Sequence, residues 1–187
     1  NRVPPDDHRT FRAWADATRV YQAELVRYHV ETLRRLKYRP NGGFCVFSLN
    51  EPAPAVSFAL VDHTGHPKPA YDALRAACAP VIVVADRPPA YVTVGDSLDL
   101  AVHVVNDLRT PLDGAVVTAT ASWAGGEQRW RFGGDVPADE CIRAGRIRLD
   151  VPETLGALTI DLRLDSDSAT ATNHYVTGVT VAPGARS

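Results

Sequence analysis

The sequence predicts a chain of two parts, an α/β fragment in residues 1–80 and an all-β, immunoglobulin-like antiparallel sandwich in residues 81–187. Two observations predict this division. As far as Pro80, apolar residues recur with a helical period that is interrupted by one short apolar run. After Pro80, apolar residues recur with a period of two. Turn clusters then separate the later runs at short intervals, which is typical of a sandwich.

The first predicted element is a helix over residues 8–37. Its apolar face follows three- and four-residue steps, at Tyr21, Leu25, Tyr28, Thr32 and Leu36. Basic residues fall in its last turn, where cations interact favourably with the helix dipole. The sequence Pro-Asn-Gly-Gly at 40–43 then ends the helix.

A nearly continuous apolar run at 44–49 predicts a strand buried on both faces, and residues 69–79 predict a second helix with a proline in its first turn. One strand and two helices cannot close a parallel sheet, and a full barrel takes about 250 residues. We therefore expect residues 1–80 to pack on the missing part of a barrel or on another chain. The sequence contains no methionine, so we expect it to be a piece of a longer polypeptide.

Beyond Pro80, alternation of apolar with polar residues predicts roughly seven or eight short strands. The clearest alternating runs are 98–104, 116–120, 146–150 and 160–165. Turn signals such as Asp113-Gly114 and Gly125-Gly126 divide them. The pattern predicts two inner faces that share one core.

Composition excludes several classes of function. The formal net charge of −2 gives no indication of a nucleic-acid partner or an anionic membrane, and no apolar stretch reaches the 18 or so residues of a membrane span. The three cysteines are scattered, which predicts buried thiols and no metal site. His63 and His66 have no evident third ligand, so a plain loop is the favoured interpretation. We expect no cofactor, and the compartment stays open.

The sequence Asn50-Glu51-Pro52 raises the question of catalysis, because Asn-Glu-Pro at a strand end holds the general acid in many (β/α)₈ glycosidases. Glycoside hydrolysis needs two carboxyl groups roughly 5 to 10 Å apart across the sugar. No second strand end in this chain is evident to place Glu24, Glu31 or Asp62 opposite Glu51. We therefore assign no catalytic residue and predict that these 187 residues alone are inactive.

Several segments resemble the end of the barrel in family-2 glycoside hydrolases, in the β-mannosidase and exo-β-glucosaminidase branch. The likeness rests on the Tyr-Gln-Ala-Glu helix at 21–24, the strand ending in Leu-Asn-Glu at 49–51, the segment Val-Asp-His-Thr-Gly-His-Pro-Lys-Pro-Ala-Tyr at 61–71 and the Ala-Pro-Val exit at 79–81. Asn173-His174-Tyr175 is similar to the Asn-x-Tyr strand that often ends the following immunoglobulin-like domain.

The resemblance implies that residues 44–50 form the eighth strand of a TIM barrel. It also implies that both catalytic carboxylates of a retaining mechanism lie upstream of Asn1, and that the parent enzyme acts on a β-linked sugar or oligosaccharide. By position, the substrate-binding residues are Phe47, Ser48, Asn50 and Glu51. The family has Trp and Gln where this chain has Phe47 and Ser48, so the identity of the sugar stays open.

A second hypothesis is a non-catalytic sandwich that binds carbohydrate or spaces domains. Trp123 and Trp130, the latter flanked by Arg129 and Arg131, are the residues that such a sugar-binding face would use. A core Trp with arginines on the solvent face is the favoured interpretation. Lys68 is likewise predicted to be a solvated lysine at a helix start.

Overall fold

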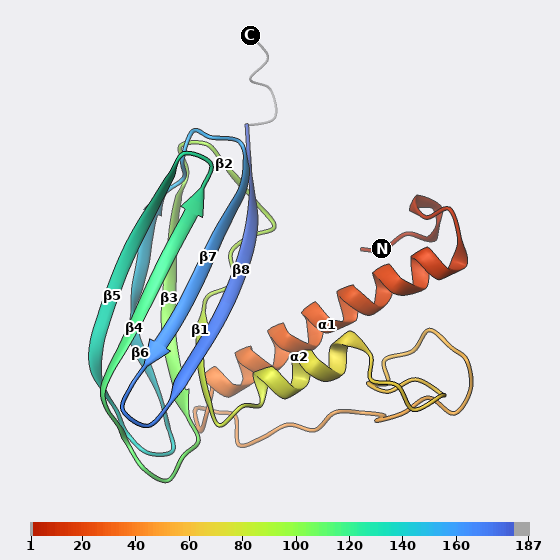
Figure 1. The fold of residues 1–187 in the computed structure, drawn as a ribbon, viewed down its shortest axis with the longest axis horizontal. Coiled ribbons are helices and arrows are strands. Elements are labelled where there is room, and N and C mark those ends of the chain that lie inside the picture. Colours follow the sequence, from red (N-terminus) through yellow and green to blue (C-terminus); the bar gives the residue numbers. More distant parts are fainter. Residues whose placement is uncertain (1, 182–187) are drawn as a thin grey trace. The chain divides into compact units, whose positions relative to one another are not determined.

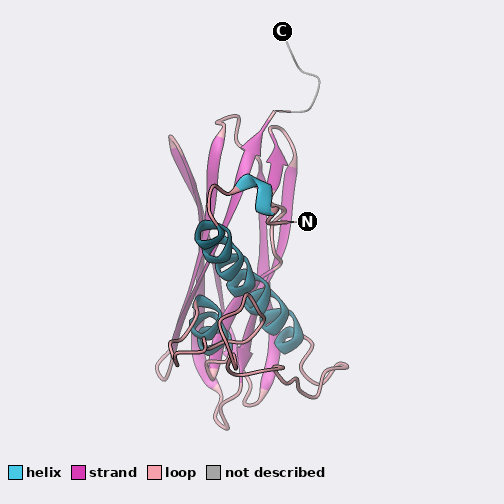
Figure 2. Cartoon of the chain, turned by 90° about the vertical axis from the view of Figure 1, so that its right-hand side faces the viewer, coloured by secondary structure: helices cyan, strands magenta, loops and turns pink. Residues whose placement is uncertain are grey.

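The computed structural model describes residues 2–181, which divide into two compact units, one ending at Ala79 and the other beginning at Pro80 (Figure 1). Among the described residues, helices occur only in the first unit and named strands only in the second (Figure 2). Each unit is described by itself below.

The first unit is built on two helices, α1 (Phe11–Arg35) and α2 (Pro69–Ala77), preceded by a 3₁₀ turn, η1 (Pro5–Asp7). The Thr10 side chain caps α1 by accepting a hydrogen bond from the backbone N–H of Ala13 at 3.1 Å. The buried Arg34 donates to the carbonyls of Ala77 and Ala79, at 2.6 and 2.8 Å, where the carbonyls at the end of α2 lack helical partners. These bonds hold α2 along the C-terminal half of α1 (Figure 1).

The predicted strand at 44–49 is not formed among the described residues. This segment belongs to the long connection between α1 and α2 that Figure 1 shows as loop, and its residues 44–48 make no backbone–backbone hydrogen bond within the described chain. Its apolar side chains are exposed rather than buried, most of all Phe47 and Leu49 at 79% and 62%. A strand requires a neighbour, and the described residues supply none.

The second unit is a sandwich of two sheets. The three-stranded sheet has the order β1-β3-β6 and the five-stranded sheet the order β2-β8-β7-β4-β5. The strands are β1 (Val81–Ala85), β2 (Tyr91–Thr93), β3 (Ser97–Asn106), β4 (Leu112–Trp123), β5 (Gly126–Val136), β6 (Glu140–Asp150), β7 (Gly156–Asp165) and β8 (Thr170–Thr180). All pairs are antiparallel except β2 with β8, which is parallel and corrects the expectation of a purely antiparallel sandwich.

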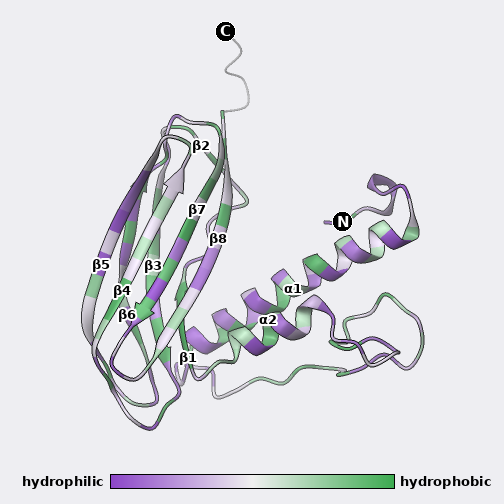
Figure 3. Cartoon of the chain, in the orientation of Figure 1, coloured by the Kyte–Doolittle hydropathy of each residue, from purple (hydrophilic) through white to green (hydrophobic). Residues whose placement is uncertain are grey.

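Alternation along the strands builds the core, as predicted. In β7 every second side chain is buried, namely Leu158, Ile160, Leu162 and Leu164, and hydrophobic and hydrophilic bands alternate along the strand in Figure 3. These side chains share one cluster with buried residues of β1, β3, β4 and β6. Trp123 and Trp130 are partly buried against this cluster, in agreement with the favoured interpretation of both.

Two residues of β8 join the two sheets by hydrogen bonds. The hydroxyl oxygen of the buried Tyr175 accepts from the backbone N–H of Ala85 and from the Asn173 amide, each at 3.0 Å. The same Asn173 amide donates to the carbonyl of Val83 at 2.9 Å. Because Val83 and Ala85 belong to β1, the Asn-x-Tyr sequence ties the five-stranded sheet to the three-stranded one.

Candidate functional site

All four predicted substrate-binding residues lie in the connection between α1 and α2, and they differ in their exposure to solvent. Phe47 and Asn50 are exposed, Ser48 is half-buried, and Glu51 is buried with 3% of its surface accessible. Ser48 has a φ of 66°, a left-handed conformation that ends any regular run at this point. The side chains that face solvent are therefore those of Phe47 and Asn50.

The buried Glu51 carboxylate is held by two side chains from its own loop. Its Oε1 atom forms an ion pair with the Lys68 ammonium, and Ser57 Oγ donates to the same oxygen at 2.9 Å. Lys68 is itself only 3% exposed and also donates to the carbonyl of Ser57 at 3.1 Å. Glu51 Oε2 is buried and has no hydrogen-bond partner among residues 2–181, so one acceptor stays open.

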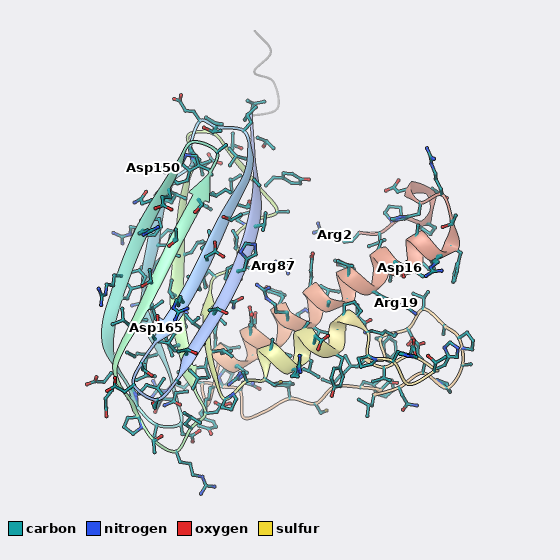
Figure 4. All side chains as sticks on the ribbon, in the orientation of Figure 1. Arg2, Asp16, Arg19, Arg87, Asp150 and Asp165 are labelled. Carbon is teal, nitrogen blue, oxygen red and sulfur yellow. The ribbon has the colours of Figure 1, made fainter. Side chains whose placement is uncertain are left out.

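This environment fixes the charge of Glu51. Burial raises the pKa of Glu51, but the hydrogen bonds from Lys68 and Ser57 and the positive charges of Lys68 and Arg19 outweigh it, so the pKa lies below its ordinary value. Figure 4 labels Arg19, which lies on α1. A carboxyl group that is ionised at neutral pH has no proton to give. The geometry therefore argues against Glu51 as a general acid.

Backbone hydrogen bonds hold the residues on either side of Asn50. The carbonyl of Leu49 accepts from the N–H groups of Leu60 and Val61, at 3.0 and 2.9 Å, and the N–H of Glu51 donates to the carbonyl of Val61 at 3.1 Å. At the end of the loop that precedes α2, the backbone N–H of Lys68 donates to the carbonyl of Leu60 at 2.8 Å. Asn50 is thus fixed in position while its side chain remains exposed.

Phe58 is a residue that the sequence analysis did not single out, and the structure brings it to the site. Its ring lies against that of Phe47, with the centroids 5.6 Å apart and the planes tilted by 47°, and it is 64% exposed. Gln22 of α1 donates from its side-chain amide to the carbonyls of Phe58 and Ala59, at 2.8 and 3.1 Å. One ring of this exposed pair, that of Phe58, therefore sits on an anchored backbone.

The burial of Lys68 overturns the prediction of a solvated lysine. The available signal was its position between Pro67 and Pro69, which restricts the backbone on both sides. A carboxylate directly after an apolar run also needs a nearby cation if it is buried. Ser57 gave no comparable signal, since its bond to Glu51 depends on the path of the loop.

Of the two loop histidines, His66 lies near a carboxylate, with its Nδ1 atom 3.9 Å from Asp62 Oδ1. Within the part of the chain that the structure describes, no group of three or more His, Cys, Asp or Glu side chains is placed to hold a metal ion. The Asp62 carboxylate instead closes a turn by accepting from the N–H and hydroxyl of Thr64 and from the N–H of His66, and these bonds lower the pKa of Asp62. None of the described helices is both long and apolar enough to cross a membrane.

Comparison with solved structures gives a fold match over both units. The exo-chitosanase CsxA of Amycolatopsis orientalis, also described as an exo-β-D-glucosaminidase, aligns with 90% of this chain at a TM-score of 0.64 and 20% identity. A variant of that enzyme in complex with PNP-β-D-glucosamine aligns equally well. No family model and no curated protein matches the sequence. The chain spans about a fifth of the length of that enzyme, and it has the fold of the part that it spans.

Proposed function

We propose that this chain is the C-terminal part of a retaining glycoside hydrolase of family 2, of the β-mannosidase and exo-β-glucosaminidase type. Residues 1–80 supply the last β/α unit of its barrel, and residues 81–187 form its accessory sandwich. The observation that carries the proposal is the fold match to an exo-β-D-glucosaminidase, which extends over 90% of this chain and therefore over both units.

The state of segment 44–49 supports the assignment of the first unit. Exposed apolar side chains, with no backbone–backbone hydrogen bond at residues 44–48 among the described residues, are what a central barrel strand shows when its neighbours are not present. In the parent enzyme, adjacent strands would pair with this backbone. The apolar side chains other than Phe47 would then be buried between the barrel interior and the surrounding helices.

Within that enzyme, Phe47, Ser48 and Asn50 contact a β-linked sugar, and Glu51 shapes the wall of the sugar pocket. The pairing of Glu51 with Lys68 argues against a catalytic role for Glu51, which supports two catalytic carboxylates from outside this chain. The alternative, a carbohydrate-binding sandwich, has less support, because Trp123 and Trp130 pack on the sandwich core.

An activity assay tests the proposal. The polypeptide that carries this chain at its C-terminus is assayed on aryl β-mannoside and aryl β-glucosaminide, beside the 187-residue chain alone. We expect turnover of a β-glycoside by the longer polypeptide and none by the 187 residues. A longer polypeptide that hydrolyses no β-glycoside would contradict the proposal, as would a coding sequence without two strand-end carboxylates upstream.

A further inference from the structure

The pair formed by Phe47 and Phe58 is unusual among the aromatic contacts of the chain, because both rings are largely exposed and come from opposite arms of one loop. Burying a large aromatic ring is favourable, so two rings held in water are a latent binding surface. The segment that carries them connects α1 and α2 (Figure 1).

The anchoring of Phe58 indicates that its half of the surface is set in advance of binding. Ala59 and Leu60, which follow it, are only 1% and 2% exposed, and Gln22 holds its carbonyl at 2.8 Å. Ser57, which precedes it, donates to the Glu51 carboxylate. A ring on a fixed backbone loses little conformational entropy when a ligand binds, which favours affinity.

An exposed polar side chain in the same loop narrows the class of ligand. Asn50 lies three residues from Phe47, has an exposed amide with no hydrogen bond among the described residues, and is tied to the Phe58 arm through Leu49 and Leu60. Aromatic faces combined with an exposed amide suit a ligand that has C–H faces and hydroxyl edges. A pyranose ring has both.

We propose that Phe58 is a sugar-binding residue that forms one platform with Phe47, in a loop that also exposes the Asn50 amide. This inference rests on the proposed function and deepens it. The tilt of 47° between the rings means that a sugar stacked on one ring meets the other at an angle, so the two rings define a corner rather than a flat floor. Phe58 thus supplies aromatic surface that Phe47 alone, standing where the family has Trp, does not provide.

The test uses the complete polypeptide that carries this chain and measures kcat and KM on the better aryl β-glycoside. The variants are Phe58→Ala and Phe58→Trp, with Phe11→Ala as the matched control. Phe11 is 72% exposed and belongs to a similar tilted pair with Trp14, with centroids 5.7 Å apart, but it lies at the start of α1. The control therefore removes an equally exposed ring from a comparable pair.

We expect Phe58→Ala to raise KM about tenfold, the scale of one lost aromatic contact, while Phe58→Trp keeps KM near the wild-type value and Phe11→Ala leaves it unchanged. Equal KM values for Phe58→Ala and Phe11→Ala would overturn the inference and leave the proposed function standing. The inference would also be overturned if Phe58→Ala lowered the Tm and Phe58→Trp failed to restore KM. A wild-type polypeptide without β-glycosidase activity would remove both proposals together.

Discussion

At position 51 a glutamate is buried, ionised and paired within its own loop. Its partner Lys68 is 17 residues away in the sequence, and the carboxylate oxygen Oε1 receives both the Lys68 ammonium and the Ser57 hydroxyl. The ion pair therefore connects the middle of the connection between α1 and α2 to its last residue. A buried pair of this kind is costly to break on one side only, because the remaining charge has no partner.

We predict that Glu51→Gln and Lys68→Met each destabilise the first unit by about 3–5 kcal/mol, whereas the double variant costs less than the sum of the two. Denaturant unfolding, together with hydrogen exchange at the amides of Glu51, Leu60 and Lys68, measures the loss of stability in each single variant and in the double variant. Arg75→Met is the control, since its ion pair with Asp72 is on the surface. Additive costs would show that the two side chains do not interact.

The lowered pKa of Glu51 predicts a pH dependence with a definite sign. A carboxylate whose folded-state pKa is depressed contributes stability above its ordinary pKa of 4.5, and this stability is lost as pH falls through the lower, folded value. We expect protection factors in the loop to fall on acidification below this range, and Glu51→Gln to remove that dependence. An unchanged acid profile in the variant would place the effect on other carboxylates, such as Asp62.

At the scale of elements, the strands could be predicted because their alternation reflects faces that the chain itself buries. The first helix was predicted as an element, but its buried face was not: Tyr28 and Leu36 of the predicted face are 39% and 41% exposed, whereas Glu31 and Arg34 are buried. The helices at 8–37 and 69–79 correspond to α1 and α2, and the alternating runs correspond to β3, β4, β6 and β7. The prediction of a strand at 44–49 was wrong for a physical reason. An apolar run indicates burial, but burial requires partners. The described residues leave the apolar side chains of this segment exposed and give residues 44–48 no backbone hydrogen-bond partner.

The exposed segment leads to a prediction about self-association. Val46→Ser with Leu49→Ser replaces two exposed apolar side chains that contribute little to folding in this chain. We expect the variant of the 187-residue chain to self-associate less than the wild-type chain and to keep the same Tm. The reason is that an exposed segment with apolar side chains and unpaired backbone groups is a template for strand pairing between molecules. Light scattering at several protein concentrations measures the self-association. A lowered Tm of the variant would mean that these two side chains are buried in solution.

The link between β8 and β1 gives a prediction for the sandwich. Tyr175→Phe removes the acceptor of the Ala85 N–H and leaves a buried donor unsatisfied, at a cost of about 1–3 kcal/mol. Thermal unfolding of the chain should show a Tm lower by several degrees. Tyr91→Phe is the control, since Tyr91 is exposed. Equal Tm values for the two variants would show that this link does not stabilise the sandwich.

For the whole molecule, the sequence and the structure differ most at the site. The positions of Phe47 and Asn50 were predicted by resemblance, whereas Lys68, Ser57 and Phe58 reach the site through the path of one loop. No periodic pattern encodes that path. The loop is set instead by single contacts, such as the Gln22 amide to the carbonyl of Phe58 and the backbone bonds of Leu49.

The central claim is that these residues complete a glycosidase whose catalytic carboxylates lie elsewhere in a longer polypeptide. The most direct measurement is hydrolysis of aryl β-mannoside and aryl β-glucosaminide by that polypeptide, by the same polypeptide truncated before this chain, and by the 187 residues alone. We predict turnover only by the complete polypeptide, because neither part holds a closed barrel with both carboxylates. Turnover by the 187-residue chain that disappears in Glu51→Gln would contradict the account.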